Sequence, residues 1–204
     1  MLVPAVRARR RVRRCFALAA VAWALAAAAP LPGLAASDTP AAFPLEIGGP
    51  FELMDHRGRT LRDTDFRGAY TLVFFGYANC PGICPVGLRN MVQAVDLLGE
   101  AGARVTPLLI TVDPESDTPE NLAPAVAKIH PALIGLTGTP AQLLAARKAY
   151  KVDAQSVGRA WNGLNLFSHG QYIYLMGPDG KFRTLFPPVM DPETMAAAIG
   201  RYLG

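Results

Sequence analysis

A buried strand that runs directly into a pair of cysteines constrains this chain more than any other feature. Residues 70–88 read YTLVFFGYANCPGICPVGL, in which the apolar run Thr71–Phe75 is followed by Cys80 and Cys84. Such a run of apolar, β-branched and aromatic residues is typical of a buried strand. Pro85 has a fixed φ and no N–H, which suits the first turn of a helix. The stretch predicts a strand, a two-thiol loop and a helix, with both sulfurs near a helix N-terminus that favours thiolates.

The rest of the chain alternates strand-like and helix-like segments. A short hairpin is expected over 51–61, with its turn at 55–58. Further strands are expected at 104–112, 133–136, 171–176 and 181–186, and helices are expected to begin near Pro85, Thr118, Thr139 and Asp191. Residues 161–170 show no regular pattern. Strands that alternate with helices and end in a hairpin and a helix indicate an α/β sandwich rather than an all-β fold.

Residues 1–36 have the composition of an export signal. They contain six arginines and no acid before residue 15, an alanine-rich apolar segment at 15–29, and small residues at Ala35 and Ala36, where cleavage is plausible. An uncleaved membrane anchor is the other interpretation, and either the general or the twin-arginine export route fits the arginine-rich start. Both interpretations predict a protein in the periplasm or anchored to the outer face of the inner membrane. We expect a linker at 37–47 and one domain at 48–204.

The leader also accounts for the basic charge and for one cysteine. The whole chain has 20 basic and 16 acidic residues, and without the six leader arginines 14 basic and 16 acidic residues remain, so nothing suggests nucleic-acid binding. Cys15 lies in the leader, which leaves Cys80 and Cys84 as the cysteines of the domain. A disulfide across so short a loop removes little entropy from the unfolded chain. A redox or metal-binding role is therefore favoured over a structural disulfide.

Three histidines could complete a metal site with these thiols. His56 lies in a polar turn and His130 precedes a proline, so both are most simply surface residues. His169 immediately precedes the strand QYIYLM, and a residue at the mouth of a strand beside the central one lies near the loop where open α/β sheets place their sites. Two thiolates and one imidazole suit Cu(I) or zinc. Spacing alone leaves His169 as either a ligand or an ordinary loop histidine.

Several motifs in order resemble one family. They are GGPFELMD at 48–55, DFRGAYTLVFFGYANCPGICP at 65–85, TVDPESDTPE at 111–120 and SHGQYIYLMGPDGKF at 168–182. The sequence resembles the Sco/SenC family of copper proteins that take part in assembling the copper site of cytochrome c oxidase. The resemblance implies an α/β fold with a thioredoxin-like central mixed sheet flanked by helices, preceded by an N-terminal β-hairpin. It also implies that Cys80, Cys84 and His169 bind copper as Cu(I) or Cu(II).

The resemblance further implies a metallochaperone that delivers copper to the oxidase copper site or keeps that site reduced. The expected partners are the copper-site subunit of the oxidase or another periplasmic copper carrier. An upstream thiol reductant is also expected, because an oxidised cysteine pair cannot bind the metal. The alternative function is a thiol-disulfide oxidoreductase that uses Cys80 and Cys84 as a redox pair on periplasmic proteins. A peroxidase of the peroxiredoxin type is disfavoured because Tyr77 stands where those enzymes carry threonine.

The chain departs from its relatives beside the expected ligands. Many relatives carry an acidic residue where this chain has Gly82, and an aspartate where it has Ser168. These departures bear on redox poise more than on the ligands themselves. Asp113 and Asp117 follow the strand at 104–112, and turn or capping chemistry is favoured for them over a role beside the metal.

Overall fold

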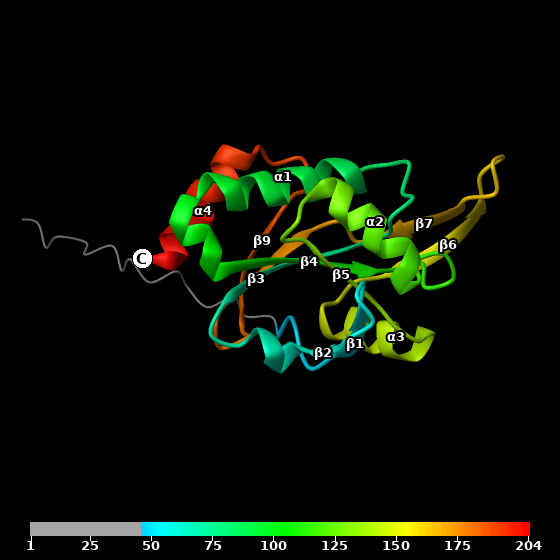
Figure 1. Ribbon diagram of the computed structural model, residues 1–204, viewed down its shortest axis with the longest axis horizontal. Helices are drawn as coiled ribbons and strands as arrows, with labels where there is room; N and C mark the ends of the chain where they lie inside the picture. Colours follow the sequence, from blue (N-terminus) through cyan, green and yellow to red (C-terminus); the bar gives the residue numbers. More distant parts are fainter. Residues whose placement is uncertain (1–45) are drawn as a thin grey trace, which may run out of the picture. The chain divides into compact units, whose positions relative to one another are not determined.

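The computed structural model describes residues 46–204, so the expected leader and most of the linker lie outside the described residues. The strands are β1 (Glu52–Asp55), β2 (Thr60–Arg62), β3 (Tyr70–Gly76), β4 (Val105–Thr111), β5 (Ile134–Thr137), β6 (Ala154–Arg159), β7 (Asn165–His169), β8 (Ile173–Met176) and β9 (Phe182–Phe186). The helices are α1 (Cys84–Leu97), α2 (Pro119–Ile129), α3 (Pro140–Ala149) and α4 (Pro192–Leu203), with short 3-10 helices η1 (Asp63–Phe66) and η2 (Gly99–Arg104) (Figure 1).

Seven strands form one mixed sheet in the order β2-β1-β5-β4-β3-β8-β9. The inner strands β3, β4 and β5 run parallel to one another. β1 pairs antiparallel with β5, and β8 pairs antiparallel with β3. β1 and β2 form the hairpin expected near the N-terminus of the domain. The prediction of a central mixed sheet flanked by helices is therefore confirmed.

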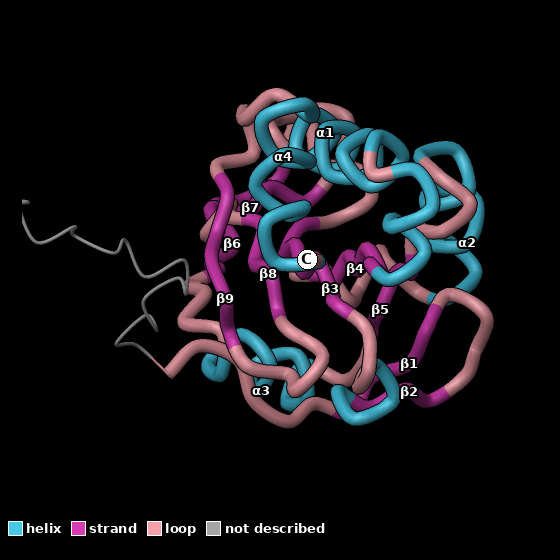
Figure 2. The backbone as a smooth tube through the Cα atoms, turned by 90° about the vertical axis from the view of Figure 1, so that its left-hand side faces the viewer, coloured by secondary structure: helices cyan, strands magenta, loops and turns pink. Residues whose placement is uncertain are grey.

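Helices cover both faces of this sheet, and β3 contributes side chains to each. Figure 2 shows α1, α2 and α4 gathered on one side of the strands and α3 on the other. Phe74 faces α1, where a Cβ added at Gly87 would lie 3.4 Å from its ring. Phe75 faces the other way and packs against Tyr150 at the end of α3, with ring centroids 5.4 Å apart. Because both faces are covered, β3 is a continuous apolar run, and it supplies some of the most deeply buried side chains.

Helix starts follow the residues that predicted them. Thr139 precedes α3 and forms a capping box, in which its hydroxyl accepts from the Gln142 N–H while the Gln142 side chain accepts from the Thr139 N–H. The Asp191 carboxylate accepts from the Thr194 N–H at the start of α4. Thr118 precedes α2, although its side chain makes no capping hydrogen bond.

The expectation that residues 161–170 are irregular is wrong for the end of that segment. β6 and β7 pair as a separate antiparallel hairpin with an irregularity between Ser156 and Gly158. In Figure 1 this hairpin extends away from the seven-stranded sheet. Nearly every residue of β6 is exposed, so the hairpin has no alternating apolar pattern from which to predict it.

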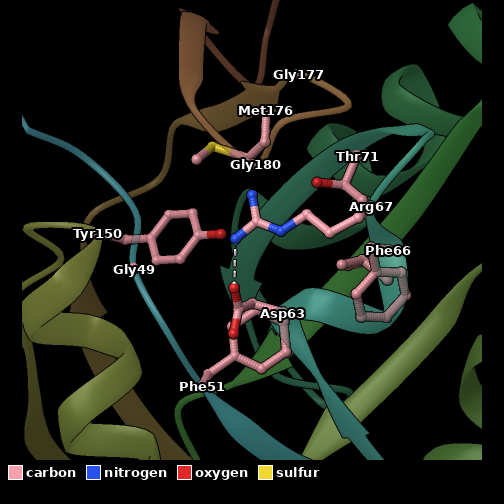
Figure 3. Close-up of a pocket in the computed structure, with 11 residues that line it drawn as sticks. Gly49, Phe51, Asp63, Phe66, Arg67, Thr71, Tyr150, Met176, Gly177 and Gly180 are labelled. Carbon is pink, nitrogen blue, oxygen red and sulfur yellow. Dashed lines mark hydrogen bonds and ion pairs between the residues drawn. The ribbon is translucent and has the colours of Figure 1, made fainter.

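Arg67 lies at the end of β3 opposite the cysteine loop and links neighbouring segments there. Figure 3 shows the Arg67 guanidinium between Asp63 and Tyr150, and its Nη2 lies 2.7 Å from Asp63 Oδ2. Arg67 also donates to the Asp179 carbonyl in the turn between β8 and β9. This end of the sheet is held together by an ion pair and a turn, and the chemically reactive side chains lie at the other end.

None of the helices at residues 46–204 is long and apolar enough to cross a membrane.

Candidate metal centre

The two cysteines lie at the end of β3 that the fold leaves open for a site. β3 ends at Gly76, the chain loops over 77–83, and α1 begins at Cys84. Cys84 is 1% exposed while Cys80 is half-buried, and both are free thiols. A side chain at Gly76 would place its Cβ 3.2 Å from the Cys84 sulfur. Glycine therefore allows the strand to pass close beside that sulfur.

His169 reaches this loop from the last position of β7. Its Nε2 lies 3.4 Å from Cys84 Sγ, although the two residues are 85 positions apart in the sequence. One ligand atom from each of Cys80, Cys84 and His169 lies within 4.8 Å of the others, and these residues form the single such group of potential metal ligands found at residues 46–204. The structure thus brings together the three residues that the sequence singled out.

The hydrogen bond at the other ring nitrogen orients the His169 imidazole. Nδ1 lies 2.9 Å from the Gly170 carbonyl oxygen, which can only accept, so Nδ1 carries the proton. The Nε2 lone pair then faces the thiols, as a metal ligand requires. The imidazole also meets the Phe74 and Tyr77 rings edge-on, with centroids 6.4 and 6.1 Å away.

The environment separates the two thiols electrostatically. A hydrogen bond from Cys84 is the largest influence on Cys80 and, with nearby backbone N–H groups, lowers the pKa of Cys80 to about 4. The same hydrogen bond and deep burial raise the pKa of Cys84 well above its ordinary value. The expectation that both sulfurs are acidic is therefore wrong for Cys84, because a thiol that donates to a neighbouring thiolate keeps its proton.

The other two histidines lie elsewhere, as expected. His56 Nδ1 accepts from the Gly135 N–H, which ties the β1–β2 turn to β5. His130 Nε2 lies 3.1 Å from Asp96 Oδ1 between α2 and α1. Their partners account for both histidines without a metal.

Tyr77 is a site residue whose place beside the imidazole the sequence analysis did not predict. It is 3% exposed, and its ring lies 5.4 Å from that of Phe167 on β7. The Phe167 N–H donates to the Tyr77 hydroxyl at 3.4 Å. Burial raises the pKa of Tyr77 to about 12, so its hydroxyl is neutral at physiological pH. The available signal was its position directly after the buried strand.

This set of donors has a narrow range of chemistry. Two sulfurs and one imidazole nitrogen suit soft or borderline ions such as Cu(I) and Zn²⁺, and they offer no oxygen ligand to Mg²⁺ or Ca²⁺. An acidic thiol beside a protonated one can also exchange with a disulfide. The geometry supports metal binding and redox chemistry at one place.

Comparison with known proteins identifies the family. The SCO1/SenC family profile matches residues 39–204. The chain belongs to the SCO1/SenC family. Protein SenC of Rhodobacter capsulatus is 39% identical over 158 residues, which cover 78% of this chain and 71% of that protein. The mitochondrial SCO2 homolog of Bos taurus is 38% identical over 157 residues, and the match spans 59% of its length.

Solved SCO1/SenC structures share the fold. Bradyrhizobium japonicum ScoI, solved with copper bound, is 37% identical with a TM-score of 0.71 and is matched over 76% of this chain and 99% of its own. Yeast Sco1 with copper bound is 31% identical with a TM-score of 0.72, over 78% and 89% of the two chains. The family expected from the sequence motifs, with its thioredoxin-like fold, is therefore confirmed.

The cysteine loop has room for a Cβ at Gly82. A Cβ at Gly82 would lie 3.7 Å from the Cys80 sulfur, which is ordinary van der Waals contact. The loop can therefore hold a Cβ there without moving the sulfur.

Proposed function

We propose that this protein is a copper metallochaperone in which Cys80, Cys84 and His169 bind the metal. The observation that carries the proposal is the convergence of one ligand atom from each residue within 4.8 Å. Two SCO1/SenC relatives of the same fold are known with copper bound, which supports copper over zinc.

The charge state of Cys80 and the orientation of His169 favour Cu(I) binding. Cu(I) prefers few, soft ligands, and here the acidic Cys80 thiol already favours the thiolate that a metal requires. Binding would displace the proton that Cys84 keeps in the free protein. The Nδ1 hydrogen bond to the Gly170 carbonyl keeps the His169 Nε2 lone pair directed at the sulfurs.

The proposed recipient is the copper site of cytochrome c oxidase, or another periplasmic copper carrier, in keeping with the role that the resemblance implies. The arginine-rich leader supports export, which would place the domain in the periplasm or on the outer face of the inner membrane. In that oxidising compartment the cysteines would need a thiol reductant before each loading.

Copper titration of the reduced protein tests this proposal. Cu(I) is titrated anaerobically in competition with a chromophoric Cu(I) chelator, and Cys80→Ser, Cys84→Ser and His169→Ala are compared with the wild type. Each substitution should weaken binding at least tenfold, whereas His130→Ala, which removes a histidine paired with Asp96, should leave it unchanged. Equal affinities for the wild type and the three site variants would refute the proposal.

A second candidate is a thiol-disulfide oxidoreductase acting on periplasmic cysteines, and the opposite pKa shifts of Cys80 and Cys84 favour it. In that role the Cys80 thiolate attacks a substrate disulfide, and Cys84 then attacks the mixed disulfide to release the reduced substrate. The discriminating measurement is reduction of an oxidised copper-site peptide. If His169→Ala still reduces the peptide and Cys80→Ser does not, the oxidoreductase function is favoured over copper delivery.

A further inference from the structure

Two buried carboxylates lie in the loop between β4 and α2, residues 112–118. Asp113 is 2% exposed and Asp117 is fully buried. A carboxylate is costly to bury unless hydrogen bonds replace its hydration. Neither caps α2, which starts after Thr118 without a side-chain capping bond. Their burial must be explained by other partners.

Asp113 reaches the hairpin that carries His169. Asn165 Nδ2 donates to both oxygens of the Asp113 carboxylate, at 3.1 and 3.2 Å, and also lies 3.3 Å from Ser116 Oγ. Asn165 is the first residue of β7 and His169 is its last. The Ser116 N–H donates to Asp113 at 3.4 Å, so the predicted turn role is present but weaker than the contact with the hairpin.

Asp117 reaches the loop that carries the cysteines. Its Oδ2 accepts from the Ala78 N–H at 3.0 Å and from the Thr111 hydroxyl at 2.6 Å. Ala78 lies two residues before Cys80. The other oxygen, Oδ1, is buried without a hydrogen-bond partner among the described residues. An unsatisfied buried carboxylate oxygen is unfavourable for stability, which indicates that the position serves another purpose.

The β6–β7 hairpin depends on such ties because it buries little of itself. β6 is almost wholly exposed, and β7 has no fully buried residue. Its links to the domain in this region include the Asp113–Asn165 bond, the Tyr77–Phe167 contact and a bond from Arg147 Nη1 to the Ala154 carbonyl at 2.6 Å. Loss of one link should let His169 move away from the sulfurs.

We propose that Asp113 and Asp117 are positioning residues that hold the two ligand-bearing segments of the copper site at a fixed separation. Asp113 holds the His169 hairpin through Asn165, and Asp117 holds the cysteine loop through the Ala78 N–H. The two carboxylates belong to one short loop, and Asp117 N–H donates to the Asp113 carbonyl at 2.9 Å, so movement of either segment is resisted by the same piece of backbone. This inference rests on the proposed copper function.

Asn165→Ala tests the link to His169 without altering a ligand. In the full chain, Cu(I) affinity should fall roughly three- to tenfold, somewhat less than the about 10–100-fold typical of removing a direct partner of a ligand. In the His169→Ala background the same substitution should change affinity less than about twofold, because the hairpin then holds no ligand. Equal losses in both backgrounds would show a general structural effect and overturn the proposal.

Asn121→Ala is the matched control. Asn121 Nδ2 donates to the Ser116 carbonyl at 2.7 Å, so it contacts the same loop without reaching the hairpin. It should leave Cu(I) affinity within about twofold of the wild type. A loss equal to that of Asn165→Ala would contradict a specific link through the hairpin.

Conservative and non-conservative variants of each carboxylate test the acceptor oxygens. Asp113→Asn keeps an oxygen that can accept from Asn165 Nδ2 and should bind Cu(I) nearly normally, whereas Asp113→Ala removes the acceptor and should weaken binding. For the other segment, Asp117→Asn keeps an oxygen for the Ala78 N–H and should bind Cu(I) nearly normally, while Asp117→Ala should not. Equal Cu(I) affinities for Asp113→Asn and Asp113→Ala would count against the proposal.

Two results separate the proposed copper function from the positioning role of the carboxylates. Failure of the wild-type protein to bind Cu(I) would refute both. Equally tight Cu(I) binding by the wild type and by Asn165→Ala would refute the positioning role alone.

Discussion

Replacing Gly76 with alanine tests how closely the end of β3 approaches the Cys84 sulfur. The added Cβ would lie 2.8 Å from Cε1 of the Phe74 ring and 3.2 Å from Cys84 Sγ. Phe74 is fully buried and Cys84 is 1% exposed, so neither can rotate into solvent to make room. The methyl group must therefore displace packed atoms or push the sulfur.

The size of the effect follows from two opposing contributions. Overpacking of a core costs about 1–3 kcal/mol, while replacing glycine with alanine recovers about 0.4–1 kcal/mol by restricting the unfolded chain. The free energy of unfolding should therefore fall by about 1–2 kcal/mol. For a domain of this size that corresponds to a decrease in Tm of about 2–8 °C. Cu(I) affinity should fall about fivefold as the sulfur shifts, equivalent to about 1 kcal/mol.

Gly82→Ala is the matched control, because it adds the same methyl group beside the other cysteine. Its Cβ would lie 3.7 Å from Cys80 Sγ, an ordinary contact. Its Tm and Cu(I) affinity should stay at or slightly above the wild-type values. Both variants are measured by thermal unfolding of the reduced protein and by chelator competition. If Gly76→Ala behaves like Gly82→Ala in both assays, the close approach of β3 to Cys84 does not constrain the site.

Three further predictions concern the thiols, a buried carboxylate and an exposed tryptophan. Because the pKa of Cys80 is lowered to about 4, iodoacetamide should alkylate Cys80 first in the metal-free protein, at a rate that is nearly constant from pH 6 to 8. Peptide mapping measures this rate, and a rate that rises tenfold per pH unit would contradict the prediction. Asp55→Ala should lower the free energy of unfolding by about 2–3 kcal/mol at pH 7, because the buried carboxylate accepts from Arg57 and Arg59. Burial by itself raises the pKa of Asp55, but the hydrogen bonds from Arg59 hold that pKa below its ordinary value. The carboxylate therefore contributes to the free energy of unfolding above about pH 4, and this contribution disappears as the pH falls. Urea unfolding at pH 7 and pH 3 measures the difference. Trp161→Ser, at a side chain that is 99% exposed, should change the unfolding free energy by less than about 0.5 kcal/mol in the same assay.

The core of the fold could be predicted from sequence because its signals are local. β3 is a continuous apolar run, and proline with a capping residue marks the start of α3 and α4. The β6–β7 hairpin could not be predicted in this way, since its strands bury few side chains and its position depends on bonds such as Asp113–Asn165, which joins residues 52 positions apart. Local patterns carry no information about such a contact.

The sequence indicated the three residues that the structure brings together, but not the electrostatics of the two thiols. Cys80 and Cys84 share one loop, and the strand that follows His169 placed that histidine near them. The helix N-terminus predicted two acidic thiols, whereas the structure has one acidic and one protonated thiol because Cys84 lies deep enough to donate to Cys80. Burial of one sulfur depends on the packing of Gly76 and Phe74, which no spacing rule describes.

If Cys80, Cys84 and His169 bind copper as proposed, the distance along the chain between Cys84 and His169 links copper binding to folding. The two cysteines remain neighbours in an unfolded chain, so they can hold a soft metal weakly before any sheet exists. His169 joins them only after β7 has docked, 85 residues later. Under the proposed binding, the metal would favour the folded state by the additional affinity that the imidazole and the folded cysteine loop supply, and the part of its binding that the unfolded chain shares would contribute nothing to stability. Copper should thus raise the Tm of the wild type more than that of His169→Ala, even at concentrations that saturate both.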